Sequence, residues 1–481
     1  MNLAQRRGER TFSNLLPYLD LDAEKGILWL KDGSAVRILS VCPKSILSAT
    51  EEELQTIQTG LISAVNQLPE GMLLQCLLVR EQTNETSDRA ALNWKAAHAK
   101  PDEQVISDSE ERLFGSKLEA LRERWANSTL FQTRIYISLR ATPEVKSSTF
   151  QKLGPFSFLT YGRKSKKARK PVATLLSELE QSSTALKLAL EAQGFEVKET
   201  PPEEANDYLF RFFNPDRMVN APIQLSSVNA RSDLSDAIAL TDLIETRKGL
   251  ALGRSRLRIG SLKTLPESCQ PGLMTEFSAE TKPFVLVLTI LVLSQTEERE
   301  RLSRRQRLAS GMAGGNRVRN ISAESQLEDI EETLSAMISS GEKLFATSLH
   351  LLTVERDEES HSFQQLLDSA ERIGSGCRWF EETVGAYPVF FGILPFAPTF
   401  ITRPKRLLSS RLSDFLPVFG IGPGHTDASV IFETPYQSIL GYSLFEKSPS
   451  GNTILIGSSG SGKSTLACGL ILGMAAKGRA S

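Results

Sequence analysis

Residues 453–465 read Thr-Ile-Leu-Ile-Gly-Ser-Ser-Gly-Ser-Gly-Lys-Ser-Thr. The last nine of them have the spacing Gly-x-x-x-x-Gly-Lys-Ser/Thr in full. The run Thr453–Ile456 before the glycines predicts a short buried strand, and Leu466, Leu470 and Met474 after them lie on one face of a predicted helix. Strand, glycine-rich loop and helix in this order predict the start of a parallel α/β domain.

Each position of this loop has a chemical role. Glycines let the backbone wrap closely around a phosphate, with amide N–H groups directed inward and the helix N-terminus adding a positive dipole. Lys463 is predicted to bridge the β- and γ-phosphates as the catalytic cation, Ser464 to ligate Mg²⁺, and Thr465 to support the helix start. The predicted cofactors are ATP and Mg²⁺, and the predicted binding residues are Gly457, Ser458, Ser459, Gly460, Ser461, Gly462, Lys463, Ser464 and Thr465.

The composition is that of an ordinary globular protein. The chain has 481 residues, 40% of them hydrophobic and 23% charged, and its net charge of −1 gives no global reason to expect nucleic acid as a partner. Five scattered cysteines without a CxxC pair predict reduced thiols and no structural zinc. The four histidines have no metal-ligand spacing, so we assign them no chemistry.

No stretch of the sequence predicts a membrane span. The longest aliphatic run, Phe284–Leu293, has about half of the ~20 residues that a bilayer-crossing helix needs, and it predicts a buried strand instead. Met1–Arg10 is basic but is followed by no apolar stretch, so it does not have the pattern of a secretory signal peptide.

Local patterns before the loop mix hairpins, helices and strands. Gly26–Leu30 and Ala35–Val41 flank a good hairpin turn, and Thr50 with Glu53 predicts a capping box at the start of a helix. Gly194 is expected to end another helix in the left-handed conformation. Further predicted strands are Met72–Val79, Phe131–Leu139, Arg256–Leu262, Leu344–Val354 and Arg378–Val384, and further predicted helices are Glu110–Trp125, Leu175–Leu190, Leu327–Met337 and Phe363–Ile373.

This order predicts α+β N-terminal domains followed by the start of an α/β RecA-like P-loop NTPase domain. The predicted boundaries give an N-terminal α+β subdomain over 1–215, a second α+β subdomain over 216–435, and the beginning of the P-loop domain over 436–481.

Two stretches are rich in cations. Arg163–Lys170 holds six basic residues, but no aromatic residue alternates with them, which favours a solvated loop over a DNA-reading site. Arg299, Arg301, Arg304, Arg305 and Arg307 stand among Glu297, Glu298 and Glu300, which predicts an ion-paired helix face within a charged helix-loop excursion over Glu297–Asn320.

The chain resembles the TraC family of conjugative type IV secretion ATPases. The resemblance rests on the order of several segments: Phe12–Tyr18, Gly26–Gly33, Phe210–Pro215, Leu394–Pro417 and Gly451–Thr465. Only the last of these is specific by itself. The resemblance implies an ATP-binding motor protein that energises pilus assembly and substrate transfer. It also implies a cytoplasmic protein at the cytoplasmic face of the inner membrane, partnered by inner-membrane subunits and assembled as a homo-oligomer, a dimer or a hexamer.

The resemblance has one departure. Sixteen residues follow Thr465, whereas the family continues with a Walker B acid and an arginine finger. We therefore expect a chain that lacks the C-terminal part of its motor and hydrolyses no ATP alone. A HerA- or FtsK-like DNA translocase is the alternative among enzymes, since the P-loop does not separate the two. A non-catalytic assembly scaffold is the alternative of another class.

Overall fold

The computed structural model of the chain describes residues 11–46, 49–82, 130–143, 170–216, 233–246, 249–314, 321–355, 362–373, 376–422, 424, 428, 430–443 and 453–476. The chain divides into two compact units. Unit 1 consists of Met1–Leu78, Arg134–Glu276 and Phe284–Phe419, and unit 2 consists of Val79–Thr133, Phe277–Pro283 and Gly420–Ser481.

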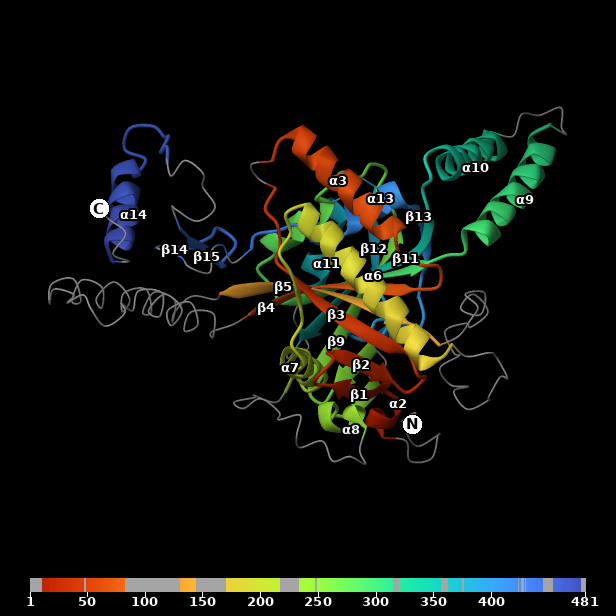
Figure 1. Cartoon of the computed structure of the whole chain (residues 1–481), viewed down its shortest axis with the longest axis horizontal. Coiled ribbons are helices and arrows are strands. Elements are labelled where there is room, and N and C mark those ends of the chain that lie inside the picture. The colour runs from red at the N-terminus through yellow and green to blue at the C-terminus, as the bar shows by residue number, and fades with distance from the viewer. Residues whose placement is uncertain are drawn as a thin grey trace. The chain divides into compact units, whose positions relative to one another are not determined.

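Unit 1 contains most of a large sheet with 13 strands (Figure 1), and only the parts of β4 and β5 that fall within Val79–Thr133 belong to unit 2. Its main path runs β1-β2-β3-β5-β4-β10-β11-β9-β8-β7, while β6, β12 and β13 pair with β3, β9 and β11. Strands from both sides of residue 215 therefore share one sheet. The strands are β1 (Tyr18–Asp22), β2 (Ile27–Leu30), β3 (Ala35–Val41), β4 (Leu73–Gln82), β5 (Phe131–Ala141), β6 (Val197–Glu199), β7 (Leu243–Thr246), β8 (Gly249–Leu252), β9 (Ser255–Thr264), β10 (Phe284–Val292), β11 (Leu344–Glu355), β12 (Arg378–Glu381) and β13 (Lys405–Leu408).

Helices pack on this sheet and on one another. α3 contacts both α6 and α13, while α6 lies against β3 and α13 against β11 and β13. The fold is thus mixed helix and sheet with antiparallel pairing, as the α+β prediction states. The helices of unit 1 are α2 (Phe12–Leu15), α3 (Glu51–Asn66), α6 (Val172–Ala192), α7 (Pro202–Phe213), α8 (Leu234–Ile238), α9 (Gln295–Gly314), α10 (Ile321–Ser339), α11 (Ser362–Arg372), α12 (Ala386–Gly392) and α13 (Ser409–Phe415); the 3-10 helix η4 is Leu273–Ala279.

The local sequence signals are confirmed where the structure describes them. β2 and β3 form the predicted hairpin, with Leu28 paired to Val36. Thr50 and Glu53 form the capping box of α3 reciprocally. Gly194 follows α6 with φ +78°, which a residue with a Cβ rarely adopts. The helix predicted over Glu110–Trp125 lies outside the described residues.

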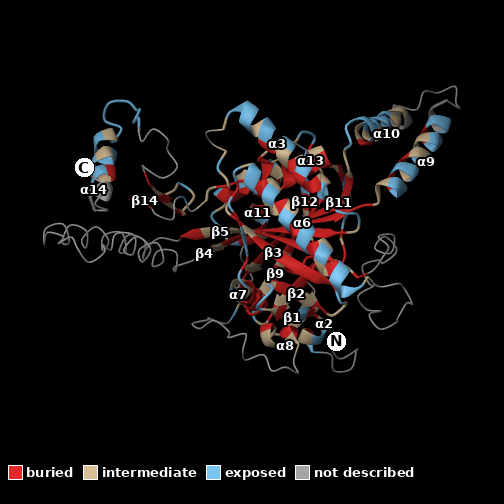
Figure 2. Ribbon diagram, in the orientation of Figure 1, coloured by how far each residue is buried: buried red, intermediate tan, exposed pale blue. Residues whose placement is uncertain are grey.

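The strands at the centre of the sheet are buried on both faces. Residues of β10 and β11 are nearly all buried, and Figure 2 shows the sheet strands as buried and the outer sides of α3 and α6 as exposed. The continuous aliphatic run of β10 is explained by this position, because a strand covered on both faces has no polar alternation. The run is a core strand, as predicted, and no helix among the described residues is long and apolar enough to cross a bilayer.

A helical hairpin, α9 and α10, is inserted between the neighbouring strands β10 and β11. The two helices pack through Leu302, Ile330 and Met337, and the pair extends away from the sheet in Figure 1. Glu298 anchors it by accepting hydrogen bonds from Arg406 on β13 at 3.1 and 3.2 Å. The hairpin is therefore held to the sheet mainly at its base.

The prediction of an ion-paired face on this hairpin is only partly correct. Arg301 pairs with Glu298 at 2.6 Å. Arg304, Arg305 and Arg307 form no ion pair with any described residue. Arg305 and Arg307 lie five or more residues beyond Glu300, and no carboxylate of α9 follows them. Arg304 has the i,i+4 spacing from Glu300 that would allow a pair, but the two side chains do not form one.

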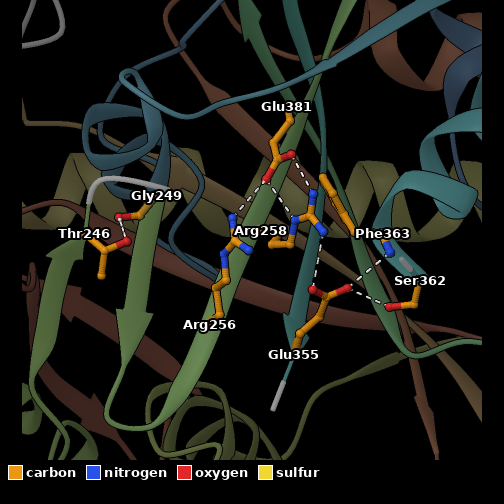
Figure 3. A network of polar contacts seen from close by, with 8 residues as sticks. All are labelled: Thr246, Gly249, Arg256, Arg258, Glu355, Ser362, Phe363 and Glu381. Atoms are coloured by element: carbon orange, nitrogen blue, oxygen red, sulfur yellow. Dashed lines mark hydrogen bonds and ion pairs between the residues drawn. The ribbon is translucent and has the colours of Figure 1, made fainter. Parts of the chain in front are cut away.

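A polar network joins β9, β11, β12 and the start of α11 (Figure 3). Arg258 on β9 donates to Glu381 at 2.8 and 2.6 Å and pairs with Glu355 at 3.5 Å. Glu355 in turn accepts from the hydroxyl of Ser362 at 2.6 Å and from the amide of Phe363 at 3.1 Å. These bonds raise the pKa of Arg258 above its ordinary value, mainly through the hydrogen bonds to Glu381.

Unit 2 contains the hairpin of β14 (Val430–Glu433) and β15 (Ile439–Tyr442) and the helix α14 (Lys463–Ala476). Arg80 is almost completely buried here, and burial lowers its pKa to about 10. Its guanidinium donates to the hydroxyl of Thr133 at 2.9 Å, to the carbonyl of Tyr436 at 2.6 Å and to the carbonyl of Glu280. Because the Tyr436 carbonyl belongs to the turn between β14 and β15, Arg80 fixes that turn.

Candidate nucleotide-binding site

The predicted phosphate loop lies immediately before α14 in unit 2. α14 begins at Lys463, the lysine of the motif, so the loop-to-helix order is as predicted. Gly460 and Gly462 have φ of +80° and +84°, and both positions therefore require the conformational freedom of glycine. The amide of Leu466 donates to the carbonyl of Gly462 at 2.9 Å, which closes the first helical turn on the loop.

Lys463 holds the loop together through its ammonium group. Its Nζ atom donates to the carbonyl oxygens of Gly457 at 2.9 Å and Ser458 at 2.5 Å. A Cβ added at Gly457 would stand 2.7 Å from the hydroxyl of Ser461, so that exposed side chain would have to turn aside. The loop therefore curls around the ammonium, and the cation lies in the concave part of the backbone where phosphate oxygens would be received.

The rest of the motif is open to solvent. Residues Gly457–Gly462, Ser464 and Thr465 are exposed, so an anion can reach the loop without displacing core side chains. Ser464 and Thr465 lie in the first turn of α14, whose unpaired backbone N–H groups favour negative charge. The nine predicted residues are thus contiguous in space, with one cation, three hydroxyls on the loop and two more at the helix start.

The predicted strand over Thr453–Ile456 is wrong. These residues form no strand, and Ile454 and Ile456 are 82% and 91% exposed. A strand is stabilised by backbone hydrogen bonds to neighbouring strands, and no described strand pairs with this run. In α14 the apolar face is also only partly covered, with Leu470 buried and Leu466 and Ile471 exposed. The RecA-like part of the predicted fold class therefore stays a prediction.

The basic run, the cysteines and the histidines are only partly covered by the described residues. Residues 163–169 of the basic run lie outside the described part, while Lys170 pairs with Glu178 at 2.7 Å. All five cysteines are free thiols, and no cluster of metal-ligating side chains occurs among the described residues. His98, His361 and His425 lie outside the described residues.

A buried polar cluster around His350 has no counterpart in the sequence analysis. Nδ1 of His350 lies 2.9 Å from the hydroxyl of Ser261, and Nε2 lies 3.0 Å from the hydroxyl of Thr402. Ser261 also donates to Glu382 at 2.8 Å, and Glu382 accepts from Arg403 at 2.9 and 3.1 Å. The cluster forms where β9 leaves β11 and β13 takes its place on the same edge of β11. With both ring nitrogens occupied, the role of His350 is to satisfy buried hydroxyls.

His350 makes the stability of unit 1 dependent on pH. Burial lowers its pKa from the ordinary 6.5 to about 4, although nearby Glu382 acts in the other direction. A base with a lowered pKa contributes stability that is complete above pH 6.5 and is lost as the pH falls toward 4, by about 3 kcal/mol for a fully buried ring. We expect His350→Gln to flatten this part of the unfolding profile, measured by urea denaturation between pH 4 and 7.

Asp414 makes stability depend on pH in the direction opposite to His350. Burial raises its pKa to about 6, so stability falls as the pH rises from 3.8 to 6. Asp414→Asn should therefore steepen the rise of stability with pH that His350 causes. Identical pH profiles for wild type and His350→Gln would contradict the assignment.

The comparisons with known proteins agree with the resemblance that the sequence showed. A family model described as TraC protein matches residues 12–369, which is more than half of the chain. The chain belongs to the TraC family, and its members take part in conjugative transfer. No curated protein matches the chain. The matched residues end before the glycine-rich loop, so the loop is independent evidence about nucleotide binding.

Proposed function

We propose that this TraC-family chain is an ATP-binding component of the motor that energises conjugative transfer and pilus assembly. The observation that carries the proposal is the loop at Gly457–Thr465, in which a complete phosphate-binding pattern curls around Lys463 and opens directly into the N-terminus of α14. Family membership supplies the process, and the loop supplies the chemistry.

In the proposed site each residue acts on a different part of the nucleotide. Backbone amides of the loop and of the first turn of α14 cradle the phosphates. Lys463 exchanges its carbonyl partners for phosphate oxygens, because a charged acceptor makes a stronger hydrogen bond than a carbonyl. Ser464 would supply a hydroxyl ligand to Mg²⁺, which would neutralise phosphate charge when bound. The proposed partners are inner-membrane subunits of a type IV secretion system, which would place the chain at the cytoplasmic face of the inner membrane.

The test is ATP·Mg²⁺ binding by the whole chain. Lys463→Ala should weaken binding at least about 10-fold, because a charge-assisted hydrogen bond contributes about 1.5 to 3 kcal/mol. Isothermal titration calorimetry measures this directly, and the matched control is Lys198→Ala, which removes an exposed lysine of β6 far from the loop in sequence.

A second variant separates the metal from the phosphate. Ser464→Ala should weaken binding with Mg²⁺ present and change little in EDTA, because only the metal ligand is lost. Equal affinity of wild type and Lys463→Ala would refute the nucleotide site and would favour an assembly scaffold that binds no ATP.

A further inference from the structure

The hairpin of α9 and α10 carries opposite charges on its two outer faces. From Arg301 to the end of α9 the sequence has four arginines and no acidic residue. α10 has no lysine or arginine and five acidic residues, Glu324, Glu328, Asp329, Glu331 and Glu332. One helix of the pair is therefore basic toward its far end and the other is acidic.

Most of these charges form no ion pair within the described part of the hairpin. Arg304, Arg305 and Arg307 are exposed, as are Glu328 and Glu332, and none of them forms an ion pair with a described residue. The seam between the helices is filled instead by Leu302, Ile330 and Met337. At the same level Gln306 donates to Glu331 at 3.1 Å, so the basic and acidic stretches lie side by side on opposite outer sides of one seam. Figure 2 shows these outer sides as exposed.

Each helix of the hairpin also exposes one large apolar side chain. Leu308, one turn after Arg304, is 65% exposed, and Ile338, at two turns from Glu331, is 71% exposed. Single exposed apolar side chains are ordinary on protein surfaces, so the choice of partner depends on the charges.

We propose that the hairpin joins copies of this chain, with the basic face of α9 in one copy against the acidic face of α10 in the next. The occupant of each face must offer the opposite charge, and the chain itself carries both on one rigid pair of helices. An anionic lipid surface or a nucleic acid would attract α9 but would be repelled by the acidic α10 beside it. A contact between two different faces is head-to-tail, and repeated around an axis it closes a ring.

Charge reversal of one face at a time tests the proposal in the whole chain. Arg304→Glu with Arg307→Glu reverses the two arginines on the outer side of α9, and Glu328→Lys with Glu332→Lys reverses the two glutamates on the outer side of α10. All four positions are exposed, and none belongs to the seam, so the variants should keep the circular dichroism spectrum of the wild type. Analytical ultracentrifugation at low and high salt gives the mass, against 53.0 kDa for one copy.

The wild type should exceed the mass of one copy at low salt and shift toward it at high salt. Each reversed chain alone should associate at least about 10-fold more weakly. The two reversed chains mixed in equal amounts should form a complex, and a chain with both faces reversed should recover self-association. The control is Glu191→Lys with Lys198→Glu, which reverses two exposed residues outside the hairpin and keeps the net charge of the wild type. It should associate as the wild type does.

Three results would overturn the proposal: a wild type that keeps the mass of one copy at low salt, reversed chains that keep the mass of the wild type, or a mixture that forms no complex. The hairpin would instead be assigned to a membrane if the Glu328→Lys, Glu332→Lys variant bound anionic vesicles but did not bind the Arg304→Glu, Arg307→Glu variant. ATP binding depends on residues of unit 2 and should be the same in all hairpin variants, so this test and that of the nucleotide site fail separately.

Discussion

Replacing Asp32 with alanine is expected to lower the free energy of unfolding by about 3 to 5 kcal/mol, because it leaves the Arg140 guanidinium buried without its counterion. The side chain of Arg140 is 2% exposed and pairs with Asp32. It also donates to the carbonyl of Pro398, and it lies 3.3 Å from the hydroxyl of Ser34. Neutral acceptors would remain after the change, but no anion among the described residues would.

Asp32 also shapes the turn between β2 and β3. It accepts from the amide of Ser34 at 2.9 Å and from its hydroxyl at 2.8 Å. Burial alone would raise the pKa of Asp32, but Arg140 and these two bonds lower it below its ordinary value, so the pair persists in mild acid.

Two variants separate the charge from the turn. Asp32→Asn keeps an acceptor for Ser34, so the turn should be preserved. Only the charge interaction with Arg140 should be lost. Asp32→Ala combined with Arg140→Met removes both charges and should recover a large part of the loss, because the buried arginine no longer lacks a partner. The measurement is urea unfolding at pH 7. If the double variant lost as much unfolding free energy as Asp32→Ala and Arg140→Met lose in sum, this account would be wrong.

Replacing Arg258 with methionine should cost about 3 kcal/mol of unfolding free energy, because two carboxylates would face each other without the cation between them. Glu355 and Glu381 have side chains that are 6% and 22% exposed. The guanidinium also lies over the ring of Phe363, 4.7 Å from its centroid, so the stacking is lost as well. The same change should loosen the start of α11, since Glu355 caps it.

Arg256 is the matched control for Arg258. It stands on the same strand, and its contact with Glu381 is longer, 3.8 Å against 2.6 Å for Arg258, so Arg256→Met should cost less than Arg258→Met. Adding Glu355→Gln and Glu381→Gln to Arg258→Met should restore part of the stability. Hydrogen exchange at Phe363 reports on the cap directly. Equal losses for Arg256→Met and Arg258→Met would show that the network does not depend on its central arginine.

Elements with a local signal were predictable from the sequence. The turn between β2 and β3 and the capping box of α3 involve residues at most a few positions apart. The helix start at Lys463 belongs to the same class, because the motif itself specifies where the loop ends. The aliphatic run of β10 was also readable, since full burial leaves a continuous apolar stretch.

Features that join distant parts of the chain were not predictable. Arg258 finds its partners 97 and 123 residues away, and Asp32 and Arg140 are 108 residues apart. Nothing in the spacing of these residues indicates which strands will become neighbours. The same reason explains the error at Thr453–Ile456. A β-prone run is a strand only when a partner strand lies beside it, and pattern alone supplies no partner.

The same distinction between local and long-range features applies to the candidate site. The nine residues and their order are fixed by the motif, and the structure adds the contacts of Lys463 to the loop carbonyls. The cluster around His350 could not be predicted from the sequence. Its other members, Ser261, Thr402 and Glu382, come from separate segments and have no regular spacing from the histidine.

The hairpin of α9 and α10 leaves and re-enters the sheet at a single place. β10 and β11 are antiparallel neighbours, and the last residue of β10, Val292, is paired with Phe345 at the start of β11. The two ends of the inserted segment are therefore already as close as the ends of an ordinary β-turn. The sheet places no constraint on how long the segment between them is. The hairpin can therefore be lengthened, shortened or given other charges in the course of evolution, while the sheet on which it stands keeps the same register.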